Sequence, residues 1–281
     1  MKYLHIMKYY CIAILIAVLS VPVLGAQSTQ TTSHGTEPLM GMSLNGSTGL
    51  YSIPSGRIGW NRPGSLGLDL GYHAIIRDRK ATHIPKAALS FFKWVELSAA
   101  FDLQPNGYIT SNKGGDFIGG LKIQFPFSKT AVALGGNIQA LNMQNTGDVR
   151  YNAGQVYVAV TYAGQFFNMP AETSVVIGKT FRENSKRWDI DYGMGFDLML
   201  FPRIFRNYAH WITDFANFSY SVESFSADAW YRGVLNTGIR VDLSFIPGLQ
   251  KFKFIADIMM TDAFDDSRAF AFGVVFGIPI L

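Results

Sequence analysis

The chain has 281 residues, a formal net charge of +4 and one cysteine, Cys11. This length suits one large β domain or two smaller domains. Because that cysteine lies near the N-terminus, the rest of the chain has no internal disulfides and no thiolate metal sites. The positive charge is not concentrated in a basic run, so it does not indicate a nucleic-acid partner.

The N-terminal residues have the order of a secretory signal peptide. Lys2 and Lys8 precede or border the apolar run "CIAILIAVL", and the small pair Gly25-Ala26 follows it. We expect a cleaved signal peptide over residues 1–26. The alternative is a permanent membrane anchor, but the run is short for a span and Pro22 interrupts it. No cysteine stands at the expected cleavage site, so a lipid anchor is not indicated.

The next residues, 27–43, are polar and rich in turn formers, which predicts a disordered lead-in. We expect the folded domain to cover residues 44–281. Its strongest candidate strands are 65–76, 116–127, 188–200, 234–246 and 269–280. Weaker candidates lie near 46–53, 85–92, 94–103, 131–141, 154–163, 173–181, 216–224 and 251–261.

The segment "WDIDYGMGFDLML", residues 188–200, shows the pattern that these candidates share. Its even positions from Ile190 to Leu200 are all apolar, whereas its odd positions carry Asp189, Asp191 and Asp197. Side chains of a strand alternate between its two faces, so this strand has one apolar and one polar face. Turn-like sequences join the candidates, which predicts an antiparallel meander.

One stretch departs from this alternation. In "PRIFRNYAHWITDFANF" the apolar side chains recur at helical spacing, and Pro202 suits a helix start. The pattern predicts one short amphipathic helix near 203–215. Its aromatic stripe, formed by Phe205, Tyr208, Trp211 and Phe215, favours a place at a membrane interface.

Two all-β architectures have this alternation: a soluble sandwich or barrel, and a membrane barrel with its apolar face toward lipid. The polar faces are rich in glycine, which suits a crowded interior. The apolar faces persist for five or six positions per strand. The aromatic residues Trp60, Trp94, Tyr151, Trp188 and Trp230 fall near strand ends, where a bilayer interface would place them. We therefore predict an antiparallel transmembrane β-barrel of about 12 strands (range 10–14) in a bacterial outer membrane.

This orientation directs the polar faces toward the lumen. The charged residues expected there are Asp69, His73, Glu96, Asp102, Asp116, Lys122, Asp189, Asp191, Asp197, Arg240, Asp242, Lys251, Lys253 and Asp257. Because both signs are present, internal ion pairs and a selective pore are equally compatible with the set.

Several segments resemble a known kind of protein. "TGLYSIPSGR" (48–57) followed by "GSLGLDLGYH" is similar to the opening of YjbH-like outer-membrane proteins linked to exopolysaccharide. "FFKWVELSAAFD" (91–102) resembles a hairpin of Gram-negative and spirochaete barrels. The chain is shorter than a typical YjbH-type protein and ends in Leu281 instead of an aromatic residue. The resemblance implies fold and location and leaves function open.

Catalytic and metal-binding patterns are weak. His73 shares a strand face with Asp69, as a general base and its orienting group would, but no serine is placed as a nucleophile. Asp262, Asp265 and Asp266 lack the spacing of a calcium loop. We expect no enzyme activity, no metal and no cofactor.

Two functions remain. The first is a narrow porin-like channel for small solutes, since about twelve strands lie between a filled barrel and a wide pore. The second is a non-conducting surface or structural barrel, such as an adhesin or an accessory to exopolysaccharide export. Expected partners are outer-membrane lipid, small solutes if the barrel conducts, and the barrel-assembly machinery during biogenesis. The sequence leaves open whether the chain forms a homo-oligomer.

Overall fold

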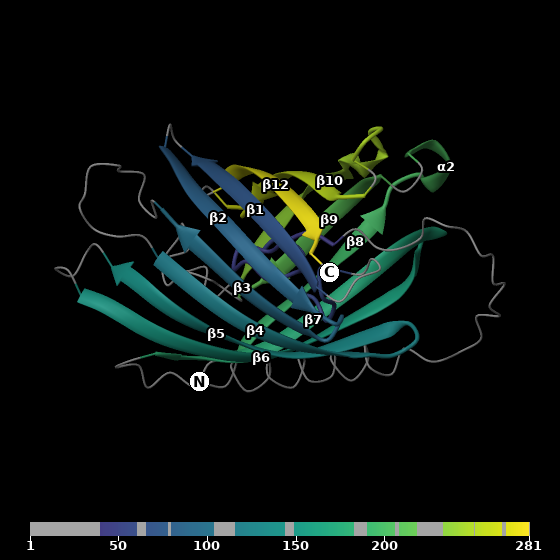
Figure 1. Cartoon of the computed structure of the whole chain (residues 1–281). Helices are drawn as coiled ribbons and strands as arrows, with labels where there is room; N and C mark the ends of the chain where they lie inside the picture. Colours follow the sequence, from purple (N-terminus) through teal and green to yellow (C-terminus); the bar gives the residue numbers. More distant parts are fainter. Residues whose placement is uncertain are drawn as a thin grey trace, which may run out of the picture. The chain divides into compact units, whose positions relative to one another are not determined.

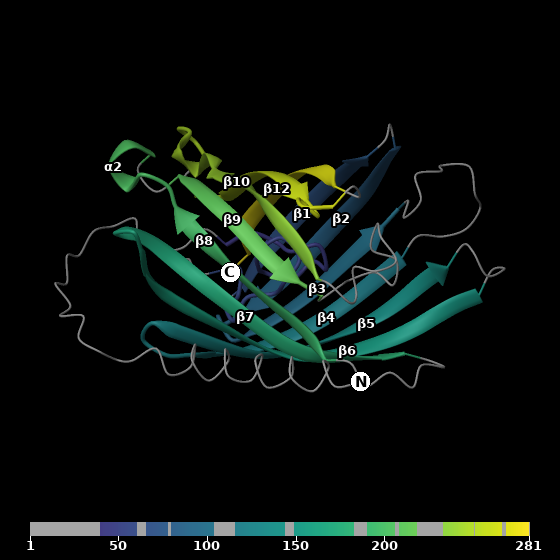
Figure 2. The ribbon, with the colours of Figure 1, turned by 180° about the vertical axis from the view of Figure 1, so that it is seen from behind.

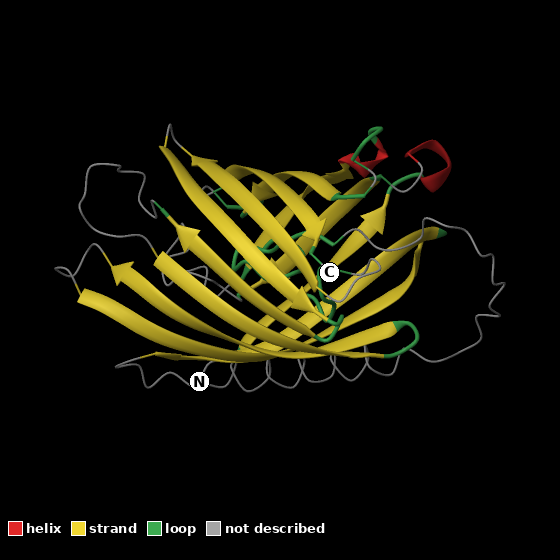
Figure 3. Cartoon of the chain, in the orientation of Figure 1, coloured by secondary structure: helices red, strands yellow, loops and turns green. Residues whose placement is uncertain are grey.

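The computed structural model shows a closed barrel of twelve antiparallel strands, in which the first strand pairs with the last (Figures 1 and 3). It describes residues 40–60, 66–77, 80–103, 116–143, 149–182, 190–205, 208–217, 233–249, 251–265 and 268–280. The expected signal peptide lies outside these residues. Each strand pairs with its neighbours in sequence, so the barrel is a simple meander.

The strands are β1 (Leu66–Arg77), β2 (Lys80–Phe91), β3 (Val95–Asp102), β4 (Asp116–Pro126), β5 (Thr130–Met143), β6 (Val149–Phe166), β7 (Met169–Arg182), β8 (Asp191–Met199), β9 (Ala209–Ala216), β10 (Val234–Asp242), β11 (Lys253–Thr261) and β12 (Ala269–Pro279). Two short helical turns accompany them, α2 (Pro202–Phe205) and the 3-10 turn η2 (Leu243–Phe245).

Burial alternates along the strands as the sequence predicts. In β12, Phe270, Phe272 and Phe276 are exposed, whereas Ala271 and Gly273 between them are buried. The exposed sets of the other strands are also leucine, isoleucine, valine and aromatic side chains, such as Leu134 and Ile138 at 53% and 69% exposure. A continuous apolar exterior around a polar interior is the surface of a membrane-spanning barrel. Among the described residues, no helix has the length and hydropathy of a membrane span.

The predicted helix near 203–215 is largely wrong. In the described part of this stretch only Pro202–Phe205 are helical, and Trp211 and Phe215 belong to strand β9. In β9 the inward positions include Ile212, which is fully buried, so apolar residues occur on both faces. This removes the period-two signal and leaves a spacing that resembles a helix.

The candidate strand 46–53 is also not part of the barrel wall. Residues 40–60, which we call the inner segment, lie inside the barrel, and only Ser52 and Arg57 among them are not buried. Residues 40–43, expected in the lead-in, belong to this segment. Trp60, expected at a membrane interface, is 3% exposed within it. The candidate 216–224 lies almost wholly outside the described residues.

A charge on the outer wall tests this orientation. Leu134 has outward apolar neighbours on both sides, Ile123 of β4 and Val158 of β6. We expect Leu134→Arg to lower the free energy of unfolding in lipid vesicles by about 2–4 kcal/mol, because a cation in hydrocarbon is poorly solvated. Leu134→Ile is the control and should leave it nearly unchanged. An unchanged value for the arginine variant would place this face in water.

Candidate functional site

The inner segment folds into a compact hairpin-like unit before the chain enters β1. Isolated bridges join Met42 to Thr48 and Gly49 to Pro54. Gly46 turns the chain at a φ of 87°, in the left-handed region that favours glycine. Views from opposite sides both show this segment, purple in the colour bar, between the near and far strands (Figures 1 and 2).

Cationic side chains of the wall bind the carbonyl oxygens of the inner segment. Lys86 Nζ of β2 donates to the carbonyls of Met42 and Ser43, at 3.3 and 2.8 Å. Lys122 Nζ of β4 donates to the carbonyl of Thr48 at 3.0 Å.

Two further cations, on β10 and β11, act in the same way. Arg240 Nη1 of β10 donates to the carbonyl of Gly49 at 3.3 Å, and Lys253 Nζ of β11 donates to that of Gly59 at 3.2 Å. All four cationic side chains are therefore used on main-chain oxygens, which must find partners once they leave water.

Carboxylates of the wall accept the segment's N–H groups. The Glu96 carboxylate of β3 accepts from the amides of Thr48 and Gly59 at 2.9 and 3.1 Å, and also from the Thr48 hydroxyl. The Asp214 carboxylate of β9 accepts from the amides of Tyr51 and Ser52 at 2.8 and 2.7 Å. These two carboxylates hold the segment from different parts of the ring.

Neutral and partly exposed groups complete the contact. Gln124 Oε1 of β4 accepts from the Ile58 amide at 2.7 Å, and Thr161 Oγ1 of β6 accepts from the Gly56 amide at 2.8 Å. Arg57 Nε forms an ion pair of 2.6 Å with Glu172 of β7. The wall thus binds mainly the backbone of the segment.

Apolar side chains of the segment pack where the wall carries glycine. A side chain at Gly67 would collide with the Trp60 ring at 2.3 Å, and one at Gly195 would meet Leu50 at 2.6 Å. The glycine-rich polar faces seen in the sequence therefore make room for the inner segment.

Ion pairs within the wall join near neighbours. Arg240 Nε pairs with Asp257 at 2.8 Å, and Lys122 Nζ pairs with Glu96 at 3.1 Å. Lys253 of β11 reaches Asp69 of β1 at 2.6 Å across β12, where Gly277 leaves the space open.

The structure places most of the predicted lumen residues on the inner face. The buried ones are Asp69, His73, Glu96, Asp102, Asp116, Lys122, Asp191, Asp197, Arg240, Lys253 and Asp257. Asp242 lies at the end of β10, half-buried, and its carboxylate caps η2 by accepting from the Ser244 amide. Lys251 does not belong there, because it is exposed in the turn before β11. Asp189 lies outside the described residues.

The pairing of His73 with Asp69 expected for a general base does not form. Asp69 binds Lys253, and His73 Nε2 lies 3.5 Å from Asp257. The His73 ring packs edge-on against Tyr51 at 5.8 Å between centroids and is fully buried. With the inner segment in place, the His73 ring is therefore shielded from solvent. The described residues contain no cluster of three metal-ligating side chains.

Besides the neutral Gln124 and Thr161, the sequence prediction missed four titratable residues of the inner wall: Lys86, Glu172, His210 and Asp214. Lys86 lies inside the weak candidate strand 85–92, and Glu172 lies one position before the weak candidate 173–181. His210 and Asp214 fell within the predicted helix. Assigning 209–216 as a strand would have put both on its inward face, where His210 binds Asp197.

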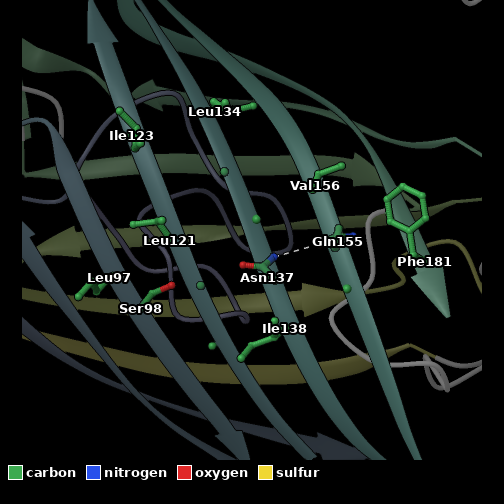
Figure 4. Close-up of a pocket in the computed structure, with 15 residues that line it drawn as sticks. Leu97, Ser98, Leu121, Ile123, Leu134, Asn137, Ile138, Gln155, Val156 and Phe181 are labelled. Atoms are coloured by element: carbon green, nitrogen blue, oxygen red, sulfur yellow. Dashed lines mark hydrogen bonds between the residues drawn. The ribbon is translucent and has the colours of Figure 1, made fainter. Parts of the chain in front are cut away.

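A hollow lies on the outer face of the barrel, over β3 to β7 (Figure 4). Leu97, Leu121, Leu134, Val156 and Phe181 line it and are about half exposed. Gly119, Gly136 and Gly154 belong to its lining, and the Asn137–Gln155 hydrogen bond of 3.0 Å lies on the inward side. Its apolar lining suits lipid chains and not a hydrophilic solute.

Comparisons with known proteins give fold neighbours only. No family model and no curated protein matches the chain. Similar solved structures include the KdgM porin in complex with disordered oligogalacturonate, at 8% identity and a TM-score of 0.46 over 76% of this chain and 99% of that one. Acinetobacter baumannii outer membrane protein Omp33 has 13% identity and a TM-score of 0.42, over 77% and 98% of the two chains. Outer membrane protein OprD from Pseudomonas aeruginosa has 8% identity and a TM-score of 0.33, over 87% and 98%. At these values no functional conclusion about this chain rests on them.

Removing one carboxylate tests the backbone contacts. We expect Asp214→Ala to increase hydrogen exchange at the Tyr51 and Ser52 amides about 10- to 100-fold, because each amide loses a charged acceptor in a buried site. Thr213→Ala, on the opposite face of the same strand, is the matched control. Unchanged protection at both amides would show that Asp214 does not hold the segment.

Proposed function

We propose that the chain is an outer-membrane β-barrel channel for small hydrophilic solutes, held closed at rest by its own residues 40–60. The observation that carries the proposal is the set of hydrogen bonds between charged or hydroxyl side chains of the wall and the backbone of the inner segment. These bonds come from β2, β3, β4, β6, β9, β10 and β11, so they are distributed around much of the wall.

Burial of the wall charges supports a closed resting state. In an open pore the lumen charges would meet water. Here Glu96, Lys122, Arg240 and Asp214 are each at most 1% exposed. The inner segment covers them, and it occupies the space that a solute would need.

The character of the contact supports opening. Polar atoms of the inner segment such as Asn45 Nδ2, Tyr51 Oη and Trp60 Nε1 are buried without a protein partner, and such atoms are ordinarily satisfied by internal water. The polar part of this contact can exchange its hydrogen bonds for bonds to bulk water, whereas Leu44, Leu50 and Ile53, which pack in a buried apolar cluster with the wall, oppose opening. The barrel wall keeps its own ladder of strand pairs without the segment.

The competing function is a barrel that never conducts, such as a structural or surface protein. The filled interior is compatible with it too. Conductance measured with the inner segment fixed or displaced separates the two.

A disulfide can fix the segment. A side chain built at Gly193 of β8 approaches Ile53 Cγ2 at 2.5 Å, so we expect Ile53→Cys/Gly193→Cys, with Cys11→Ser, to form a bond between segment and wall. A valine can displace it: a Cβ at Gly56 would lie 2.3 Å from the Ala131 carbonyl oxygen, which the strand ladder holds in place.

The experiment records single-channel current in planar bilayers. We expect rare openings for the unmodified chain, frequent openings for Gly56→Val, and none for the oxidised cysteine pair until reductant is added. The single variant Ile53→Cys controls for the substitution itself. Silence of Gly56→Val, in protein shown by circular dichroism to be folded and inserted, would refute the channel. Openings that persist in the oxidised pair would show that the segment is not the gate.

A further inference from the structure

The charges of the inner wall are unequal in number. Among the strand residues that the structure describes as buried, eight are acidic and four are basic. The acidic set is Asp69, Glu96, Asp102, Asp116, Asp191, Asp197, Asp214 and Asp257, and the basic set is Lys86, Lys122, Arg240 and Lys253. Described wall charge therefore favours cations over anions.

The basic and the acidic residues of the wall also differ in how far their partners come from the inner segment. Lys122, Arg240 and Lys253 each pair with a wall carboxylate and keep that partner when the segment leaves. Of the four wall cations, only Lys86 forms no ion pair with a described wall carboxylate, and its hydrogen bonds go to carbonyls of the segment.

Two carboxylates of the wall, in contrast, depend on the inner segment for their main partners. Glu172 of β7 is paired with Arg57, which belongs to the inner segment, and its side chain is 13% exposed. Asp214 of β9 is bound by two segment amides and the Ser52 hydroxyl, and its remaining described bond is from the neutral Asn236 amide. Departure of the segment thus removes one positive charge, Arg57, and uncovers two carboxylates that form no ion pair with a described wall cation.

From this geometry we infer that the opened barrel selects cations, and that its solutes are small cationic molecules or metal cations passing Glu172 and Asp214. This inference rests on the proposed channel function. Carboxylates in a narrow pore with low-dielectric walls concentrate cations and exclude anions, and this effect weakens as salt screens the charges. The described wall carries both signs of charge. Three of its four cations are offset by paired carboxylates, and the remaining acidic residues leave the lumen negative.

The test uses the full chain with Gly56→Val, so that the wall keeps its residues. The reversal potential in a KCl gradient gives the permeability ratio of potassium to chloride. We expect a ratio of about fivefold or more in dilute salt, falling toward unity at about 1 M salt as the Debye length shrinks.

Further substitutions in this variant test which residues set the permeability ratio. Adding Glu172→Gln and Asp214→Asn should lower the ratio at least about twofold, since both uncovered charges are gone. Adding Lys86→Gln should raise it. The matched control is Asp265→Asn, a neutralised carboxylate in the turn between β11 and β12.

Failures of the two proposals are distinguishable. Conductance with a ratio of one or less would overturn the cation inference while leaving the channel in place. A ratio insensitive to Glu172→Gln and Asp214→Asn would overturn the assignment of these residues. Absence of conductance in folded Gly56→Val would remove the channel and this inference together.

Discussion

The structure depends on one constraint: a stretch of irregular backbone lies inside a barrel and needs partners for its N–H and C=O groups. A strand would satisfy them in a ladder, but the wall of twelve strands is already closed. The wall supplies the partners through side chains instead. Lysine and arginine bind the carbonyls, and Glu96 and Asp214 bind the amides. Charged groups make stronger hydrogen bonds than neutral ones. Each of these buried charges also has a partner, which offsets part of the free-energy cost of removing it from water.

The same constraint explains how one sequence suits two environments. Outward positions hold side chains such as Phe272 and Leu134, which hydrocarbon solvates well. Inward positions combine charge with glycine, because the space is shared with a second chain segment. Gly67 beside Trp60 and Gly195 beside Leu50 are places where any larger residue would collide with that segment. The interior therefore resembles a small polar protein core enclosed in a membrane protein.

Much of the barrel could be predicted from the sequence, because lipid outside and polar groups inside impose period two. Strand β12, with phenylalanine alternating with alanine and glycine, shows this most clearly. The prediction was wrong where the inner segment supplies apolar surroundings to inward positions. Ile212 of β9 packs in a buried cluster with Ile53 and Val176, so both faces of β9 contain apolar residues and the strand resembled a helix. No local pattern shows that 40–60 folds into the lumen, since its partners lie up to 194 positions away along the chain. The YjbH-like resemblance stays a prediction.

The accessibility of residue 53 tests whether the inner segment fills the lumen. Ile53 is 0% exposed inside the barrel, and Phe264, in the turn after β11, is 89% exposed. With Cys11→Ser, single cysteines at these two positions can be labelled with a charged, water-soluble maleimide in the folded, membrane-inserted protein. We expect Ile53→Cys to react at least about 100-fold more slowly than Phe264→Cys, because a buried site is reached only by local opening. Equal rates would contradict it, because residues 40–60 would then lie in water and the lumen would be open.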